Sequence, residues 1–517
     1  MRKLFLTALA LAAVATAADR VKIDAGTLEG TVNSESSIRI FRGVPFAAPP
    51  VGNLRWQPPQ PVRPWTGVRK ADQFGPHCVQ GQVFSDIVFR DKEMSEDCLN
   101  LTVWAPSKPT AARLPVYVWF YGGGFAAGCE DEPRYDGESF AKKGIVVVNV
   151  NYRLGIFGFF SHPELTAESA HKASGNYGLL DQMAALQWVH RNIAAFGGDP
   201  NKVTIGGESA GSLSVSAQMA SPLSRDLFQQ AVGESGAFFG MVGGRKMASL
   251  AESEKQGAAF ATAIGAASLA DLRAKSSADL LKDASKNGGG MAFWPNVDGY
   301  FLPTDVQSIF AQGKQSRIPL LAGWNADEVR MMVMMPKEKP NAKTFPERLR
   351  QQFKDNADAA LKVYPASNDE EALRSAGDLA SDSFIVFGTW KWLEMQTKTG
   401  KPVYRFEFDR TVPIPDAMKS TAPGLKSLGS AHAAELEYVF NMLPSKKADW
   451  QPEDQTVAET MNAYWANFIK TGDPNGASLN KWPNFTKTHE VMHLDTESKA
   501  APEVHRDRYE FLDSLQK

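Results

Sequence analysis

The chain has 517 residues, of which 43% are hydrophobic and 22% charged, a composition typical of a globular protein with a large core. Its 56 Lys and Arg residues nearly balance its 58 Asp and Glu residues. The resulting net charge of −2 provides no basic field, so we expect neither nucleic acid nor an anionic membrane surface as a partner.

Residues 1–18 are predicted to form a cleaved secretory signal peptide. The segment starts with Met1-Arg2-Lys3, continues with an apolar run over Leu4–Val14, and ends in small residues. The apolar run is too short to span a bilayer, and no later run approaches that length. We therefore expect a secreted or periplasmic mature chain without stable membrane insertion.

Three cysteines are present, and export to an oxidising compartment permits a disulfide. Cys78 and Cys98 are 20 positions apart and could close one surface loop. Such a crosslink stabilises a fold by on the order of 3 kcal/mol. Cys129 is then left over, and nothing nearby in the sequence would activate it as a nucleophile. We interpret Cys129 as a buried free thiol that serves packing.

Strands dominate the first part of the chain. Residues 19–70 alternate short extended runs with proline-rich turns, which favours antiparallel edge strands and loops. Apolar runs follow at 101–104, 116–120 and 145–150, and the last is apolar on both faces, as a covered parallel strand is. The spacing at 179–196 predicts a helix with a Gly-Gly-Asp-Pro stop. This alternation predicts a doubly wound α/β sheet.

The chain becomes mainly helical after residue 209, with further predicted strands at 318–323 and 403–408. No internal repeat is visible, and no linker is long enough to divide the chain. Because the pattern of sheet strands never restarts, we expect one large domain over residues 19–517, with helical insertions that cap it.

The stretch at 203–211 combines a short buried strand with Gly207-Glu208-Ser209-Ala210-Gly211, the G-x-S-x-G pattern of a nucleophile elbow. Glycine is needed two positions either side of the serine, because a Cβ there would collide with the neighbouring strand and helix. Such a turn holds the serine hydroxyl out at the end of a sheet, above a helix N-terminus. Ser209 is therefore the predicted nucleophile.

A serine in such an elbow needs an acid and a histidine base, which follow it along the chain in that order. Of the four histidines beyond Ser209, His432 lies in a small-residue loop that opens a helix. The acid is expected where a strand ends, and both Asp327 and Glu328 closely follow the predicted strand at 318–323. Spacing alone does not choose between these two carboxylates.

Three consecutive glycines, Gly122-Gly123-Gly124, follow the predicted strand at 116–120. They let backbone N–H groups face a common point, and the N–H of Ala210 would complete an oxyanion hole. The same glycines resemble a dinucleotide fingerprint, which requires an acidic residue at the end of the next strand. That strand, at 145–150, is followed by Asn151 instead. We therefore expect no nucleotide cofactor.

The segment His489-Glu490-Val491-Met492-His493 formally matches the zinc-binding pattern H-E-x-x-H. Zinc ligation through this pattern requires a helix, so that both imidazoles lie on one face. The surrounding residues indicate a short strand, and no third ligand is evident. We interpret the match as coincidence and expect no metal.

Together these motifs resemble the type B carboxylesterase family, which includes carboxylesterases, cholinesterases and the non-catalytic neuroligins. The similarity covers nearly the whole mature chain. Its most specific blocks are Phe196–Gly211, Ser95–Leu101, Asn151–Gly155, Asp327-Glu328, and His432 with Tyr438-Val439-Phe440. The resemblance implies an α/β-hydrolase fold, which has a mainly parallel central sheet, helices on both faces and helical insertions over the site.

The resemblance also implies roles for individual residues. It selects Glu328 over Asp327 as the acid of a catalytic triad with Ser209 and His432. The implied oxyanion donors are Gly123, Gly124 and Ala210. The implied supporting interactions are a Cys78–Cys98 disulfide, an Arg42–Glu96 ion pair, and support of the site by Glu208 and Ser235.

Departures from the cholinesterase pattern narrow the expected substrate. The loop between the two paired cysteines contains no tryptophan, the residue with which cholinesterases hold a quaternary ammonium group. Gly289 and Met291 align where cholinesterases narrow the acyl pocket with aromatic residues, so we expect a roomier pocket lined by Gly289, Met291 and Phe293. The methionines between Met331 and Met335 either line this pocket or pack within a helix.

The predicted function is therefore that of a serine esterase acting on uncharged carboxylic esters through an acyl-enzyme on Ser209. A neuroligin-like binding module is the alternative from another class, but every triad and oxyanion position is filled here. Within enzymes, a lipase or an acyltransferase is the alternative. The sequence does not name the ester or the oligomeric state.

Overall fold

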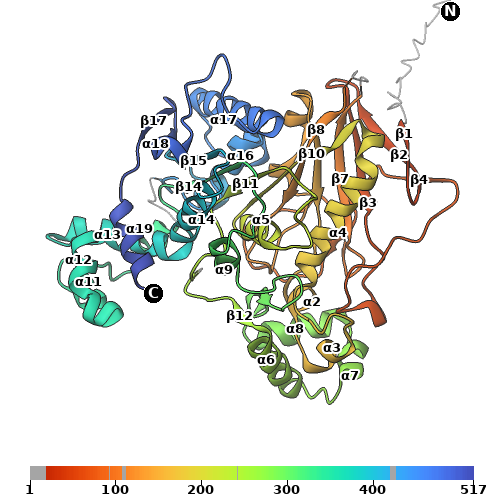
Figure 1. The fold of residues 1–517 in the computed structure, drawn as a ribbon, viewed down its shortest axis with the longest axis horizontal. Coiled ribbons are helices and arrows are strands. Elements are labelled where there is room, and N and C mark those ends of the chain that lie inside the picture. Colours follow the sequence, from red (N-terminus) through yellow and green to blue (C-terminus); the bar gives the residue numbers. More distant parts are fainter. Residues whose placement is uncertain (1–18, 92, 108–111, 242, 420–426, 517) are drawn as a thin grey trace, which may run out of the picture.

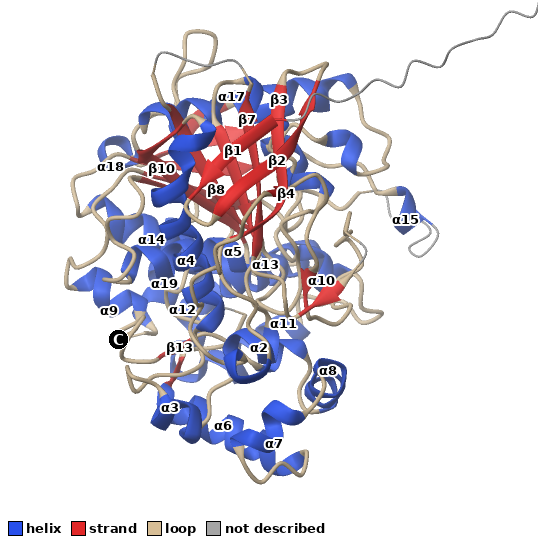
Figure 2. Cartoon of the chain, turned by 90° about the vertical axis from the view of Figure 1, so that its right-hand side faces the viewer, coloured by secondary structure: helices blue, strands red, loops and turns tan. Residues whose placement is uncertain are grey.

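The structure is a computed structural model that describes residues 19–516 except 92, 108–111, 242 and 420–426, so the predicted signal peptide lies outside the described residues. The described chain is organised around a 13-stranded sheet with the order β1-β2-β3-β7-β9-β8-β10-β11-β14-β15-β16-β17, and β4 pairs with β2 off this path. Figure 2 shows these strands in the upper half of the molecule, above helices α6, α7 and α8.

The strands of the large sheet are β1 (Asp19–Ile23), β2 (Gly26–Asn33), β3 (Ile38–Pro45), β4 (Val68–Lys70), β7 (Asn100–Pro106), β8 (Leu114–Phe120), β9 (Val146–Val150), β10 (Gly198–Glu208), β11 (Gln230–Glu234), β14 (Leu320–Asn325), β15 (Val403–Phe408), β16 (Glu490–Leu494) and β17 (Lys499–Pro502). Two short pairs lie outside it, β5 (His77–Cys78) with β6 (Met94–Ser95) and β12 (Ala248–Ser249) with β13 (Asn296–Val297).

The centre of the sheet is parallel, and its edges are antiparallel. Strands β9, β8, β10, β11, β14, β15 and β16 run in one direction, whereas β1, β2, β3 and β7 at one edge and β17 at the other pair antiparallel. All five residues of β9 are buried, because helices cover both faces of a parallel sheet. The mainly parallel sheet predicted from the sequence is confirmed.

Helices cover the sheet in two groups. One group consists of α4 (Tyr177–Asn192), α5 (Ala210–Ala220) and α14 (Phe387–Thr397), and the other of α1 (Glu138–Lys142) and α17 (Pro452–Thr471). The predicted helix at 179–196 is thus α4 followed by a 3₁₀ turn, Ile193–Phe196. The predicted strand at 318–323 begins and ends two residues later, as β14, and β15 has the predicted bounds.

Helical insertions interrupt the sheet strands after β11 and after β14. The first contains α6 (Leu250–Ala263), α7 (Leu269–Ala274), α8 (Ser277–Lys286) and α9 (Val306–Ala311), and the second α10 (Arg330–Met334), α11 (Thr344–Phe353), α12 (Ala357–Val363), α13 (Asp369–Ser381) and a π-helical turn, Asp382–Val386. The remaining helices are α2 (Gly155–Phe159), α3 (Pro163–Glu168), α15 (Asp416–Lys419), α16 (Leu436–Val439), α18 (Phe485–Thr488) and α19 (Arg506–Ser514). Figure 1 shows α6, α7 and α8 gathered with α3 at one end of the molecule.

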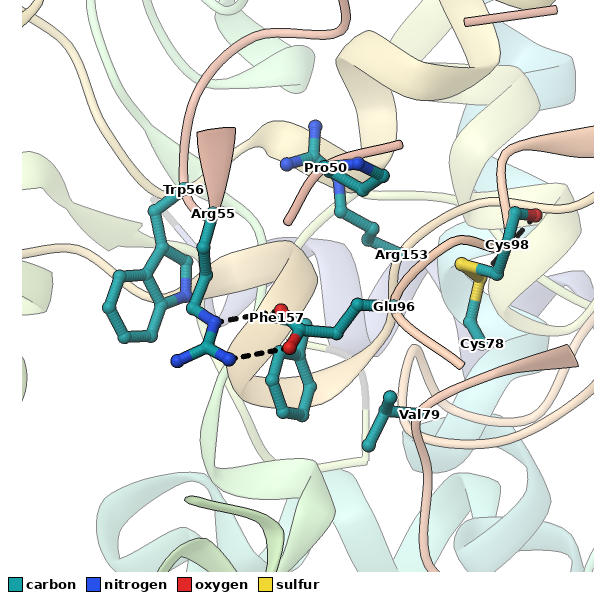
Figure 3. A pocket seen from close by; sticks show the side chains of 9 residues that line it. All are labelled: Pro50, Arg55, Trp56, Cys78, Val79, Glu96, Cys98, Arg153 and Phe157. Atoms are coloured by element: carbon teal, nitrogen blue, oxygen red, sulfur yellow. Dashed lines mark hydrogen bonds and ion pairs between the residues drawn. A yellow bond between two sulfur atoms is a disulfide. The ribbon is translucent and has the colours of Figure 1, made fainter. Parts of the chain in front are cut away.

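A disulfide joins Cys78 to Cys98, and a buried ion pair lies beside it (Figure 3). Arg55 donates to Glu96 through two parallel bonds, Nε to Oε2 at 2.7 Å and Nη2 to Oε1 at 2.5 Å. The predicted ion pair between Arg42 and Glu96 is therefore wrong. Arg42 lies on β3, where its guanidinium donates to Thr31 on the neighbouring strand at 3.3 Å and lies over the ring of Phe74.

Arg55 also anchors the first helical insertion. Its Nη1 donates to the carbonyls of Leu272, Arg273 and Lys275, where α7 ends. The last carbonyls of a helix have no partner within the helix, so a guanidinium placed there satisfies them. One arginine thus connects the disulfide loop, through Glu96, to an insertion more than 200 residues later in the chain.

We expect Glu96→Gln to lower the free energy of unfolding by about 3 kcal/mol, because removing one partner leaves the other charge buried and unpaired. A double-mutant cycle measured by urea denaturation checks the assignment of the pair. Arg55→Met and Glu96→Gln should be strongly non-additive, whereas Arg42→Met and Glu96→Gln should add to within about 0.5 kcal/mol. Coupling of Glu96 to Arg42 but not to Arg55 would contradict the structure.

Candidate active site

Ser209 lies at the turn between β10 and α5, where the elbow was predicted. Its backbone has φ 53° and ψ −120°, a strained conformation for a residue with a side chain. The turn is too tight for side chains at the flanking glycines. A Cβ on Gly207 would lie 2.4 Å from the carbonyl carbon of Gly211, and one on Gly211 would lie 1.9 Å from the Phe120 carbonyl oxygen.

The structure brings Ser209, Glu328 and His432 together from three distant parts of the chain. The Nε2 atom of His432 lies 2.9 Å from the Ser209 hydroxyl oxygen. Its Nδ1 atom lies 2.5 Å from Oε2 of Glu328. The imidazole therefore bridges a hydroxyl and a carboxylate, the arrangement through which a histidine can accept the serine proton and be stabilised as it does so.

Glu328 is held by its own set of donors. Its Oε1 atom accepts hydrogen bonds from the Ser235 hydroxyl at 2.5 Å and from the backbone N–H of Asn325 at 2.9 Å. The neighbouring Asp327 points elsewhere and binds Arg330 at 2.7 Å. Two adjacent carboxylates that the spacing could not rank thus occupy different environments, and Glu328 is the one in contact with the histidine.

The glycine loop after β8 lies beside the serine. A Cβ on Gly122 would lie 3.1 Å from Cβ of Ser209. Gly123 and Gly124 have φ values of 98° and 63°, and their N–H groups donate to no protein acceptor in the described chain. The N–H of Ala210, the first residue of α5, likewise has no acceptor within its helix. The loop continues as a turn rather than as the helix that a dinucleotide fingerprint needs.

Known proteins resemble this chain over most of its length. A sequence model of the Carboxylesterase family matches residues 17–512. The chain belongs to the carboxylesterase family. It is 37% identical to the fumonisin B1 esterase of Sphingopyxis macrogoltabida, over 93% of this chain and 87% of that protein. It is 34% identical to the para-nitrobenzyl esterase of Bacillus subtilis (strain 168), over 91% of this chain and 94% of that one.

The liver carboxylesterase of Sus scrofa is 34% identical to this carboxylesterase over 97% of this chain and 92% of its own length. A solved structure of a PNB esterase superimposes with a TM-score of 0.81 at 32% identity, covering 95% of this chain and 99% of that one. These similarities confirm the predicted family and the α/β-hydrolase fold. Among the described residues, no helix is both long and apolar enough to cross a membrane.

Glu208, expected to support the carboxylesterase site, is buried against the imidazole, with Oε1 3.3 Å from Nε2 of His432. Burial raises the pKa of Glu208 to about 8. Burial lowers the pKa of His432, but the carboxylates of Glu208 and Glu328 more than offset this and raise it to about 10. The site therefore stabilises the protonated imidazole. This is the form that His432 would take when it accepts a proton from the serine.

The predicted pocket residues lie in different surroundings. A Cβ on Gly124 would lie 3.2 Å from the methyl carbon of Met291, so Met291 lies against the glycine loop. Gly289 begins the turn that carries Met291 and has open space around it. Phe293 is only 4% exposed and packs against Phe160 and Phe260, and its ring also lines a small cavity beside Arg245 and Trp294.

Several other predicted features can be placed. Met332 and Met335 are 72% and 66% exposed, so they are not packed within the protein as one alternative required.

The sulfur of Cys129 is buried 3.4 Å from Oδ1 of Asn151, and burial raises the pKa of its thiol well above the usual range. His489 ends α18 with a left-handed backbone, and His493 lies on β16, so the H-E-x-x-H segment is not helical.

The sequence did not point to three residues that surround the site. The ring of Phe384, in the π-helical turn, lies edge-on to the His432 imidazole at 5.2 Å between centroids. The side chain of Asn325 donates to Glu435, a buried carboxylate near the histidine. No sequence motif identifies these residues. Tertiary packing brings each of them to the site, and the sequence around each is typical of an ordinary helix, strand or loop.

We expect Glu328→Gln to lower kcat about 10³- to 10⁴-fold on a simple aryl ester, because the amide cannot stabilise a charged imidazole. Asp327→Asn is the matched control, since it changes the adjacent carboxylate, and it should cost less than about tenfold. Steady-state kinetics of the two variants checks the assignment. The opposite ranking would assign the acid to Asp327.

The pH dependence of kcat/KM should reveal the effect of Glu208 on the pKa of His432. A general base must be neutral, and the Glu208 carboxylate holds the proton on His432 to higher pH. Glu208→Gln should therefore move the acidic limb of the kcat/KM profile to lower pH by about 1 unit. The exposed Glu370→Gln is the control and should leave the limb in place. A shift of the limb to higher pH in Glu208→Gln would contradict this account.

Proposed function

We propose that this carboxylesterase hydrolyses uncharged carboxylic esters through an acyl-enzyme on Ser209. His432 takes the proton of the Ser209 hydroxyl as the oxygen attacks the ester carbonyl, and Glu328 orients and stabilises the imidazolium. The N–H groups of Gly123, Gly124 and Ala210 donate to the oxyanion of the tetrahedral intermediate. The observation that carries the proposal is the single imidazole within hydrogen-bond distance of both the hydroxyl and the carboxylate.

His432 then acts as an acid to complete acylation, and it acts as a base again in deacylation. His432 donates its proton to the departing alkoxide, so the alcohol leaves and the acyl group stays on Ser209. A water molecule, deprotonated by His432, then attacks the acyl carbonyl, and the carboxylic acid is released as Ser209 regains its proton. The relatives named as esterases support this reading, and no step requires a metal or a nucleotide. The absence of a tryptophan in the disulfide loop supports an uncharged rather than a cationic alcohol.

Labelling by a fluorophosphonate probe tests the nucleophile. The purified protein should be labelled at Ser209 and lose its hydrolysis of p-nitrophenyl acetate in step with labelling. Ser209→Ala should bind no probe and lose activity about 10⁶-fold. The control is Ser212→Ala, a buried serine one turn further along α5, which should still be labelled. Full hydrolysis by Ser209→Ala would overturn the proposal.

The proposal includes export. Because the segment before Asp19 has the pattern of a signal peptide, the protein recovered from the secreted or periplasmic fraction should begin near Asp19 when its intact mass is measured. Replacing Arg2 and Lys3 by glutamate should retain the precursor inside the cell. A full-length chain in the exported fraction would contradict cleavage.

A further inference from the structure

A short segment of the first insertion faces the proposed oxyanion loop. It begins with Gly288-Gly289-Gly290 and runs to Trp294. The methyl carbon of Met291 lies 3.2 Å from the position that a Cβ on Gly124 would take. Trp294 packs edge-on against Phe125, the residue after Gly124, with 5.0 Å between ring centroids. The segment therefore forms a wall next to the loop that would bind the oxyanion.

The backbone of this wall has little intrinsic rigidity. Gly288 and Gly289 have φ values of 105° and 77°, and the 3₁₀ turn that follows spans only Gly290–Ala292. Consecutive glycines sample many backbone conformations at little cost. The position of Met291 must therefore be held by contacts from outside the segment.

Arg245 supplies those contacts. Its Nη1 donates to the carbonyl of Met291, and its Nη2 donates to the carbonyl of Ala292 at 3.3 Å. The guanidinium also lies over the ring of Trp294, 4.9 Å from the centroid. Gln256 adds one bond, from its side-chain amide to the carbonyl of Ala292 at 2.9 Å. Arg245 thus contacts three of the four residues Met291–Trp294 of the wall.

The guanidinium has no competing partner. Within the described part of the chain, no carboxylate forms an ion pair with Arg245, and burial lowers its pKa. A guanidinium has planar donors in a fixed fork, so two adjacent carbonyls and an aromatic face fix its orientation well. Such a side chain restricts the segment more than a lysine would, because an ammonium group lacks the fork and the flat face.

We propose that Arg245 is a positioning residue that sets acyl specificity, because it holds Met291 against the oxyanion loop and so limits the size of the acyl group. The proposal rests on the proposed function and extends it to one side chain. Releasing the wall lets Met291, whose unbranched side chain adapts readily, move away from Gly124. Bulky acyl groups then gain access, whereas acetate, which fills little of the pocket, is less affected.

The test compares p-nitrophenyl acetate with p-nitrophenyl pivalate, which differ only in the bulk of the acyl group. Arg245→Met keeps the length of the stem and removes the donors. The ratio of kcat/KM for pivalate to that for acetate should rise about tenfold in this variant, the size of effect that small changes in a pocket wall produce. Arg245→Lys should give a smaller rise, and Gln256→Leu, the matched control, should change the ratio less than about threefold.

A double-mutant cycle separates this role from a structural one. Met291→Ala should raise the same ratio, and adding Arg245→Met should produce little further change, because Arg245 acts through Met291. An equal loss for both esters, an unchanged ratio, or independent multiplication of the two effects would overturn the inference. If Arg245→Met does not fold, the Arg245→Lys and Met291→Ala cycle decides the question by the same ratio.

Two readouts keep this inference distinct from the function on which it rests. Fluorophosphonate labelling of Ser209 in each variant shows that the nucleophile is intact. If the unmodified protein hydrolyses neither ester through Ser209, the proposed function fails. If it hydrolyses both and the ratio does not respond to Arg245, only the role of Arg245 fails.

Discussion

The tight turn at Ser209 is the constraint on which the rest of the site depends. It leaves no room for side chains at Gly207 and Gly211, because the strand, the helix and the end of β8 approach within van der Waals contact. The same close approach to the Phe120 carbonyl brings the following glycine loop beside the serine. One packing constraint therefore places both the hydroxyl and the N–H groups that would face a developing oxyanion.

Buried carboxylates around a single imidazole form the second constraint. Burial raises the pKa of Glu435 to about 7 and that of Glu234 well above its usual range, and both lie close enough to influence Glu208. Specific donors hold this group of acids, among them Ser235 to Glu328 and the indole of Trp465 to Glu234. Burial thus favours the neutral forms of Glu435 and Glu234. The carboxylates of Glu208 and Glu328, in their ionised forms, raise the pKa of His432 and so stabilise the positive charge that it takes up during each turnover.

The insertions are attached to the hydrolase core by arginines at carbonyl groups. Arg55 reaches the end of α7 while paired with Glu96, and Arg245 reaches the carbonyls of Met291 and Ala292. A guanidinium suits this task because it offers several donors in one plane. The sheet fixes the reacting groups, and these two arginines hold the covering segments in place relative to the sheet.

The sequence by itself determined the elbow, the order of the triad candidates, the glycine loop and the mainly parallel sheet, because each depends on local backbone geometry. It left Asp327 and Glu328 equivalent by spacing, and it misassigned the partner of Glu96. Only the tertiary structure decided these points, together with Arg245 and Phe384. The physical reason is that long side chains and ring orientations are set by packing between elements far apart in the chain, which no local pattern encodes.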